Sequence, residues 1–460
     1  MNSVANLPNR LEKLVGSDRV RASESALREF AISGRAPMAV LKPRSAEEVA
    51  EIVSFAAAEK LAVVPCGSCS KLELGMPPQR YDLAMDMTDL RQIEHYDPGD
   101  LTLSVDAGLP LNELAKALAA KNQFLPLAVP CGETSTVGGA IASGIDSTLR
   151  QQYGTPRDSL IGAEFVDGTG KQCKSGGRVV KNVTGYDLHK LLIGSLGTLA
   201  VITRLNFRTF PLPDLQGAHL AGFPTLEAAL NFHASLLKSG LPLSNTELFD
   251  SDFSALLAGF LNKEGASVPE SLANHGWQVF ASFEGSAPVM ERIHRELRER
   301  SVQAQAVRSE TLSTRSCQQV SEALREAFQW LRRAAPSVAL LRIVLPQFAP
   351  GDATELLHVA HQSPLRSAFV LHACNVAYLA LLADSEDVST NAVLEHGVAE
   401  LFSRVEAKKG STTVLHAPVW LKDRINVWGA RRADFPMMQR VKQAFDPHHI
   451  FAPGRFVGGI

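Results

Sequence analysis

Two runs of small residues have the composition of a ligand cradle. The first, CGSCSK at residues 66–71, follows Pro65, and the second, LAVPCGETSTVGGAIASG, covers residues 127–144. Glycine and small hydroxyl residues let backbone N–H groups approach a phosphate or a flat cofactor closely. Taken alone, each run is explained equally well as a Gly-rich turn between two secondary elements.

The cysteines form no metal or disulfide pattern. The chain has 6 cysteines, at positions 66, 69, 131, 173, 317 and 374. Cys66 and Cys69 stand in a CxxC, but neither a second pair nor a histidine follows at ligand spacing. We therefore interpret both as small residues of a loop and expect no metal site. Such sparse cysteines indicate a reducing compartment.

Length and charge describe an ordinary globular protein with more than one domain. At 460 residues the chain exceeds the size at which a single core stops growing. Its formal net charge of -2 lacks the basic surplus that nucleic-acid binding requires. The N-terminus has no signal-peptide core, and no apolar run is long enough to span a bilayer. We expect a cytoplasmic protein without a transmembrane segment.

Helix and strand periods surround the two runs. Residues 1–36 carry one amphipathic pattern and no strand signal, which predicts a helical leader. A capping box precedes a helix over 45–60, and a buried strand over 61–67 leads into the first run. Alternating residues over 81–87 and 101–108 predict two strands of one sheet. A helix over 109–122 leads into the second run.

Two further segments follow before a change of pattern. Residues 161–171 predict a strand that turns at Asp167-Gly168, and a helix is expected to end near Gly194. After it comes a long strand with one apolar face, made of Leu199, Val201, Leu205 and Phe207.

The pattern of predicted helices and strands changes after Pro211 and Pro213, which indicates a domain boundary there. From Thr225 to residue 410, helical and strand patterns alternate, including one apolar strand over 369–382. This alternation predicts a separate α+β domain in which an antiparallel sheet carries helices on one face.

Five motifs in a fixed order resemble a known family. They are CGSCSK, TSTVGGAIASG, YGTPRDSLIGAEFVDGTG, KNVTGYDLHKLLIGSLGTLAVIT and FDPHHIFAPGRF. Their order is similar to that of FAD-binding oxidoreductases of the vanillyl-alcohol oxidase fold, also called the PCMH type. Within that family, the motifs resemble those of FAD-binding subunits of bacterial glycolate oxidases.

The resemblance implies an α+β fold with a two-subdomain FAD-binding module of the vanillyl-alcohol oxidase type. An α+β cap domain with an antiparallel sheet would cover the flavin ring, and a C-terminal segment would return to the module. The expected divisions are a helical leader at 1–36, the FAD-binding domain at 37–213, the cap at 214–410 and the returning segment at 411–460.

The resemblance also places FAD against both small-residue runs. Backbone N–H groups of the first run, together with those of Gly138 and Gly139, would donate to the pyrophosphate. Backbone groups of Val201 and Ile202 would line the cofactor. The full set implied is Pro65, Cys66, Gly67, Ser68, Cys69, Ser70, Gly132, Thr136, Gly138, Gly139, Ser143, Gly144, Val201 and Ile202.

Attachment of the flavin is expected to be non-covalent. Relatives that bond the ring use a histidine in the first loop or a cysteine four residues before the first TVGG glycine. This chain has no histidine in the first loop and Thr134 at the second place.

The resemblance does not extend to the catalytic motifs. Oxidation of a 2-hydroxy acid needs a base for the hydroxyl proton and a cation or metal for the carboxylate. No counterpart of the family's His-rich cap motif stands out. His416 takes the place of the histidine in the family's Glu-His-Gly, but Leu415 and Ala417 replace its neighbours. His416 is therefore a weak candidate base.

Three functions stay open at this point. The chain is expected to be the FAD-binding subunit of a glycolate or 2-hydroxy-acid oxidase complex, with a catalytic flavoprotein subunit and an iron–sulfur subunit as partners. Membrane contact would then arise only through those partners. The alternatives are a self-sufficient FAD-dependent dehydrogenase for a 2-hydroxy acid or alcohol, and a non-catalytic assembly module.

Overall fold

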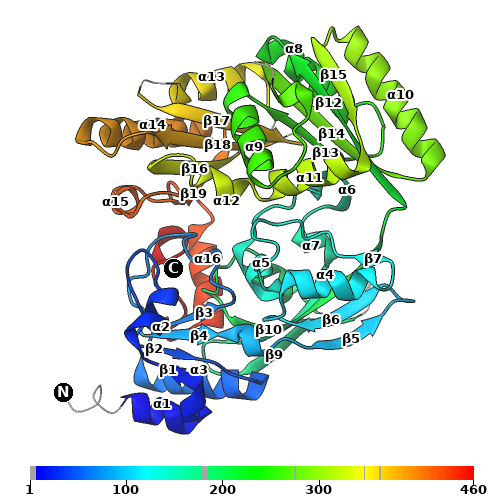
Figure 1. The fold of residues 1–460 in the computed structure, drawn as a ribbon. Coiled ribbons are helices and arrows are strands. Elements are labelled where there is room, and N and C mark those ends of the chain that lie inside the picture. The colour runs from blue at the N-terminus through cyan, green and yellow to red at the C-terminus, as the bar shows by residue number, and fades with distance from the viewer. Residues whose placement is uncertain (1–6, 179–184, 274–275, 347, 362–363, 374) are drawn as a thin grey trace.

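The computed structural model describes residues 7–460 except 179–184, 274–275, 347, 362–363 and 374. The first part of the KNVTGYDLHK motif, from 181 to 184, and Cys374 thus lie outside the described residues. Two small sheets, of four and five strands, and a separate two-stranded pair occupy one end of the molecule, and one large sheet occupies the other (Figure 1). No helix in the described part of the chain is long and apolar enough to cross a membrane.

The first sheet is mostly parallel and is built from the N-terminal 86 residues. Helix α1 (Leu7–Val15) packs with the capped helix α3 (Ala46–Glu59) on one core with this sheet. The leader region is not purely helical, because it supplies the edge strand β1 and the short helix α2 (Glu24–Glu29). The strand order is β1 (Val20–Arg21), β2 (Ala39–Leu41), β4 (Leu83–Asp86), β3 (Val63–Cys66).

The second sheet is antiparallel and carries the helices next to the second small-residue run. Helices α4 (Leu111–Ala119) and α5 (Val137–Ser143) share its core. Smaller elements around it are β7 (Gln123–Phe124), β11 (Phe210–Pro211), α6 (Arg150–Tyr153) and α7 (Pro156–Ser159). The strand order is β5 (Ile93–Asp97), β6 (Thr102–Asp106), β10 (Val201–Arg208), β8 (Leu160–Val166), β9 (Gln172–Gly176).

Three expectations for this half were wrong. Strands β4 and β6 belong to different sheets, because β4 is buried between two parallel neighbours and does not pair with β6. The described part of the expected helix before Gly194 is a 3-10 helix, Leu188–Leu192. A register shift between Ile202 and Arg204 turns β10, so Val201 packs in the core of the first sheet while Leu205 packs in that of the second.

The third sheet has eight antiparallel strands. The expected single strand over 369–382 is an antiparallel pair, β17 (Arg366–His372) and β18 (Val376–Ala383). The turn between them lacks the glycine or proline that marks most hairpins, so it was missed in the sequence. The order is β15 (Arg308–Leu312), β12 (Leu215–Phe223), β14 (Trp277–Gly285), β13 (Leu243–Phe249), β17 (Arg366–His372), β18 (Val376–Ala383), β16 (Ser337–Val344), β19 (Ser411–His416).

Helices cover both faces of this sheet, which corrects the expectation of one covered face. Along β12, Ala221 and Phe223 point into one core while Leu220 points into the other. The outer layer contains α8 (Leu226–Leu237), α10 (Ala287–Gln303), α13 (Pro350–Ala360) and α14 (Val388–Ala407). The inner layer contains α9 (Ser251–Lys263), α11 (Thr314–Arg325) and α12 (Ala327–Leu331), and α11 and α12 face the two small sheets (Figure 1).

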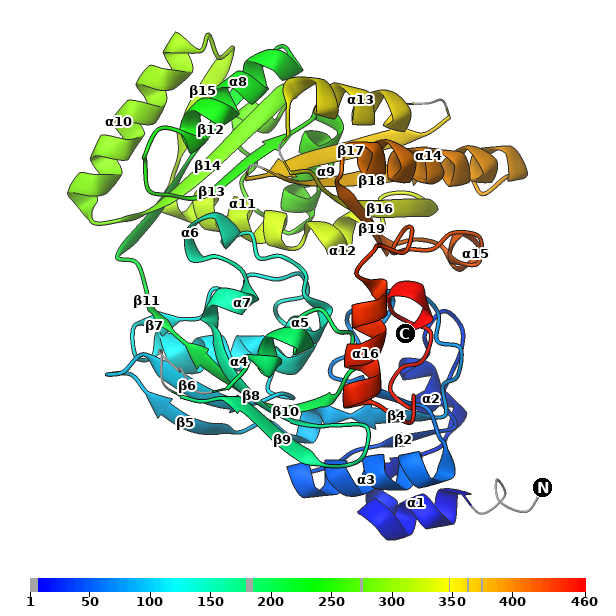
Figure 2. The same ribbon diagram turned by 180° about the vertical axis from the view of Figure 1, so that it is seen from behind.

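The C-terminal segment crosses back from the large sheet to the small ones. After α15 (Val419–Lys422), helix α16 (Phe435–Phe445) stands beside β4 and β10 (Figure 2). Its Phe445 ring stacks on Phe165 with centroids 5.8 Å apart. The N–H of Val63 then donates to Ile450 O at 2.7 Å, so the last residues extend the edge of the first sheet.

A buried ion pair fastens this segment. Lys442 Nζ donates to Asp446 Oδ2 and Thr198 O, both at 2.7 Å, and to Phe451 O at 3.0 Å. The side chains of Lys442 and Asp446 are 2% and 0% exposed. Burying both charges of such a pair costs desolvation free energy, which their attraction offsets. Removing one partner leaves the other charge buried and uncompensated.

We predict that Lys442→Met lowers the free energy of unfolding by about 3–5 kcal/mol, because the Asp446 carboxylate stays buried without its cation. Urea unfolding followed by circular dichroism measures the change. Arg366→Met is the matched control, since its pair with Asp384 is 45% and 56% exposed and is worth less than about 1 kcal/mol. Equal losses in both variants would contradict the prediction.

Candidate functional site

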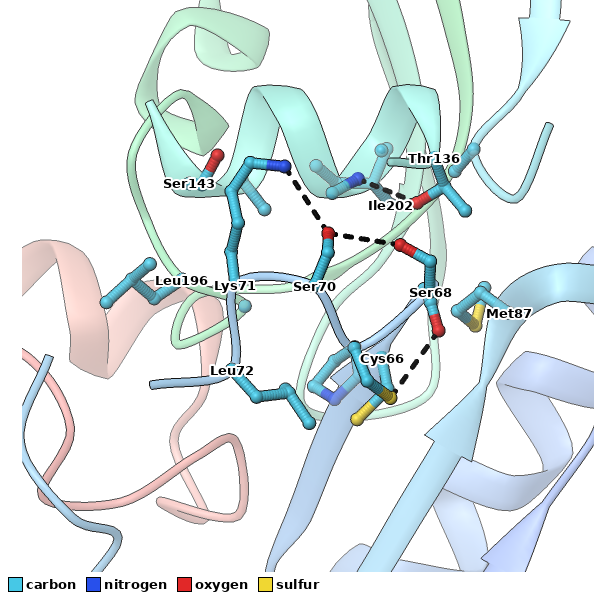
Figure 3. Close-up of a pocket in the computed structure, with 18 of the residues that line it drawn as sticks. Cys66, Ser68, Ser70, Lys71, Leu72, Met87, Thr136, Ser143, Leu196 and Ile202 are labelled. Carbon is cyan, nitrogen blue, oxygen red and sulfur yellow. Dashed lines mark hydrogen bonds between the residues drawn. The ribbon is translucent and has the colours of Figure 1, made fainter. Parts of the chain in front are cut away.

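A cleft lies where β3 and α5 meet β10 (Figure 3). The two small-residue runs form facing walls of this cleft, and small or apolar side chains make up most of its remaining surface. Its lining comprises residues 65–72, Met87, Ala107, Thr136, Gly138, Gly139, Ala142, Ser143, Leu196, Gly197, Ala200, Ile202 and Arg455.

The first wall is the loop that follows β3. The backbone of Cys69 is left-handed, with a φ of 60°. The Ser68 hydroxyl bonds the Ser70 hydroxyl at 3.2 Å across this turn. A Cβ on Gly67 would clash with the Thr136 hydroxyl, so at this point the two walls meet without a side chain between them. Only backbone and small groups face the cleft here, as a closely bound phosphate requires.

The second wall is the start of helix α5. The Thr136 hydroxyl caps this helix by accepting from Gly139 N at 3.1 Å. Gly138 N donates to Ala107 O at 2.7 Å, and a Cβ on Gly138 would lie 2.7 Å from Ala107 Cβ. The N–H groups of Gly138 and Gly139, expected to donate to a pyrophosphate, are thus already engaged inside the protein. The two glycines instead let the helix lie close to β6 and the first loop.

All but three of the residues assigned from the sequence line this cleft. Gly144 packs on Gly194, where an added Cβ would lie 2.6 Å from Cα, and Val201 is buried in the core of the first sheet. Gly132 lies on the other side of its loop, with N–H donating to Glu326 Oε1 at 3.1 Å. The register shift in β10 accounts for the position of Val201, because it leaves Ile202, and not Val201, on the side of the strand that lines the cleft.

Two basic side chains in the cleft were missed. Lys71 Nζ donates to Ser70 Oγ at 3.5 Å and to Ser135 Oγ, and burial lowers the pKa of its amine. Arg455 donates to the carbonyls of Leu72 and Leu74, yet its Nε has no hydrogen-bond partner. Lys71 is the last residue of the first run, so its position was a usable signal. Arg455 comes from the C-terminal return and carried no such signal.

These features fit an anionic cofactor with a flat ring. Arg455 is 3% exposed, its buried Nε–H has no partner, and its side chain lines the cleft together with that of Lys71. Two buried cations with an unsatisfied donor suit a pyrophosphate. Met87, Leu196 and Ile202 supply apolar surface for a ring.

A second, more apolar chamber lies between residues 145–148 and the inner face of the large sheet. One ion pair in it has unused capacity: His372 Nδ1 bonds Glu247 Oε1 at 2.7 Å, with both side chains 4% exposed. His372 Nε2 and Glu247 Oε2 have no partner. Burial lowers the pKa of His372, but the Glu247 carboxylate outweighs it and the net pKa is raised.

A rigid ionic network forms one side of the same chamber. Asp146 accepts from Arg342 Nε at 2.9 Å and from Arg150 at 3.0 Å. Tyr378 faces Arg342, and burial raises the pKa of its phenol, which therefore stays protonated. Apolar walls close the rest of the chamber, among them Phe253, Phe328 and Leu415.

The candidate base His416 lies outside the linings of both cavities. Burial, with the nearby charges of Lys422 and Arg332, lowers its pKa to about 4. Such a neutral imidazole is a weak proton acceptor at pH 7. No group of three or more metal-ligating side chains occurs among the residues that the structure describes.

Comparison with known families identifies two segments. Residues 37–176 match the family described as "FAD binding domain", and residues 212–456 match "FAD linked oxidases, C-terminal domain". The chain is 25% identical over 431 residues to glycolate oxidase subunit GlcD of Bacillus subtilis, covering 91% of this chain and 88% of that protein. It is 36% identical over 201 residues to glycolate oxidase subunit GlcE of Escherichia coli, covering 44% of this chain and 57% of that subunit.

Solved structures show the same fold at low sequence identity. The 4-ethylphenol oxidase of Gulosibacter chungangensis superimposes with a TM-score of 0.77 at 15% identity, covering 98% of this chain and 96% of that one. A p-cresol methylhydroxylase gives a TM-score of 0.78 at 16% identity with the same coverage.

We predict that Gly67→Ala weakens FAD binding and lowers stability by about 1–3 kcal/mol, because the methyl group forces the two walls of the cleft apart. Fluorescence titration of the apoprotein and thermal unfolding measure the two effects. Gly177→Ala is the control, since a Cβ there meets nothing within 4 Å. Wild-type FAD affinity in Gly67→Ala would show that the walls do not clamp the cofactor.

We also predict that FAD affinity falls as pH rises through the pKa of Lys71, which burial places below the usual lysine value of 10.5. The protonated amine favours the pyrophosphate, and deprotonation removes that attraction. Titrations between about pH 7 and about pH 10 should show the decline in the wild type and in the exposed control Lys121→Met. If Lys71→Met shows the same decline, the pH dependence of FAD affinity arises from another group.

Proposed function

Since this chain belongs to the FAD-linked oxidase family, we propose that it is the FAD-carrying subunit of a glycolate or 2-hydroxy-acid oxidase complex. The protein is an FAD-dependent oxidoreductase that holds its cofactor without a covalent bond. The observation that carries the subunit role is a complete cofactor cleft beside a chamber whose described residues hold no metal-ligand cluster.

Bound FAD supplies the two-electron chemistry of this site. The loop at 65–71 holds the anionic part of the cofactor, and Lys71 and Arg455 compensate its charge. Leu196, Ile202 and Met87 exclude water from the ring. In the proposed complex, a catalytic flavoprotein subunit oxidises the 2-hydroxy acid and an iron–sulfur subunit receives electrons. The complex would lie in the cytoplasm and reach a membrane only through those partners.

A second candidate function rests on the inner chamber. His372 and Glu247 line this chamber, and their buried Nε2 and Oε2 atoms have no partner. The pair could therefore provide one donor and one acceptor for a ligand that carries both a carboxylate and a hydroxyl. In a self-sufficient 2-hydroxy-acid dehydrogenase, Glu247 would accept the hydroxyl proton and His372 would orient it. This geometry favours the Glu247–His372 pair over His416 as the base. The pure assembly module is disfavoured, because the cofactor cleft is intact.

The deciding experiment purifies the chain under anaerobic conditions, once alone and once co-expressed with the proposed catalytic flavoprotein and iron–sulfur subunits. We expect the chain alone to show a flavin spectrum that glycolate and D-lactate do not bleach, and affinity purification to recover a second flavoprotein and an iron–sulfur protein. Electron flow through this subunit would then appear only in the reconstituted complex.

Rapid bleaching of the isolated chain would contradict the subunit role and support the second candidate. In that case Glu247→Gln should abolish bleaching while His416→Ala leaves it unchanged. A chain that stays colourless after incubation with FAD would leave only the assembly module.

A further inference from the structure

One cap carboxylate reaches into the second cofactor loop. Glu326 lies between α11 and α12, and its Oε2 accepts from Cys131 N at 2.8 Å while its Oε1 accepts from Gly132 N at 3.1 Å. The side chain is only 17% exposed. Two consecutive amides that point at one carboxylate form an anion-binding concavity.

The loop that receives Glu326 is strained and is tied to the cofactor cleft. Cys131 adopts a left-handed φ of 59°, which costs a non-glycine residue free energy unless its surroundings hold it. Four residues further on, the Ser135 hydroxyl bonds the Ser70 hydroxyl at 3.3 Å and accepts from Lys71. The loop that holds Cys131 is thus in direct contact with the first wall of the cleft.

The local charge balance also depends on Glu326. Arg325 Nε lies 3.1 Å from Glu326 Oε1. Burial lowers the pKa of Lys71, and the negative charge of Glu326 partly offsets this by raising it. Without this carboxylate, the two amide donors lose their acceptor and Arg325 keeps only its ion pair with Glu322. Leaving a buried donor without a partner costs more free energy than one hydrogen bond contributes to stability.

We propose that the amide pair of Cys131 and Gly132 is a carboxylate-binding site, which the cap domain fills with Glu326, and that this contact holds the second loop in its FAD-binding conformation. Glu326 is therefore a positioning residue for the cofactor. The proposal rests on FAD binding in the cleft, and it is independent of whether the chain oxidises a substrate by itself.

The test is chemical rescue in the full-length apoprotein. Glu326→Ala should weaken FAD binding by at least about tenfold, because two amide donors lose their acceptor. Formate or acetate should restore most of that affinity by occupying the vacated concavity, whereas chloride at equal ionic strength should not. Glu322→Ala is the matched control, since Glu322 is 57% exposed and its ion pair with Arg325, at 2.9 Å, does not reach the loop.

Unchanged FAD affinity in Glu326→Ala would overturn the proposal. Weak affinity that formate and chloride restore equally, or that neither restores, would overturn the carboxylate site. Should the alanine variant not fold, Glu326→Gln replaces it, because glutamine keeps the size but offers one acceptor for two donors. We expect weakened FAD binding there without formate rescue, and wild-type binding would overturn the proposal. These measurements report FAD affinity and do not depend on glycolate oxidation. The carboxylate-site proposal and the proposed function can therefore fail independently of each other.

Discussion

The cleft depends on one close approach between two sheets that differ in topology. Gly67 follows the end of a parallel strand, and Thr136 begins a helix that lies on an antiparallel sheet. Because no side chain fits between them, the backbone of one wall is held against the hydroxyl of the other. Around this contact, the glycines at 138 and 139 use their N–H groups to lock helix α5 in place. The surface left for a ligand is therefore set by backbone positions, which hold their place better than flexible side chains do.

Charge inside the protein is concentrated where the segments meet. Lys71 joins the two cofactor loops, and Arg455 brings the C-terminal segment into the cleft. Lys442 holds the same segment to Thr198, just before β10. In each case the cation donates to carbonyls or hydroxyls of a segment distant in sequence. Burial lowers the pKa of all three groups. These cations thus add specificity to the assembly of segments, at the cost of desolvation.

The sequence was most informative about local features. Both small-residue loops, the capped helix α3 and the two-part fold with its FAD cofactor could be inferred from spacing and from family resemblance. What failed depended on pairing between distant segments. The bulge that separates Val201 from Leu205 arises from the register with β8, and the burial of β4 arises from its two neighbours. Glu247 and His372 are 125 residues apart, so no motif could join them. Glu326 meets Cys131 across 195 residues for the same reason.

The large sheet is inserted between β11 and α16, and its two connections leave from opposite sides. The incoming connection enters β12, next to one edge strand, and the outgoing one leaves β19 at the other edge. The large sheet is thus tethered to the two small sheets at both of its sides. Between these attachments, Glu326 at the start of helix α12 accepts from the amides of Cys131 and Gly132 in the second cofactor loop. Three separate connections therefore fix where the inner helical layer lies over the cleft.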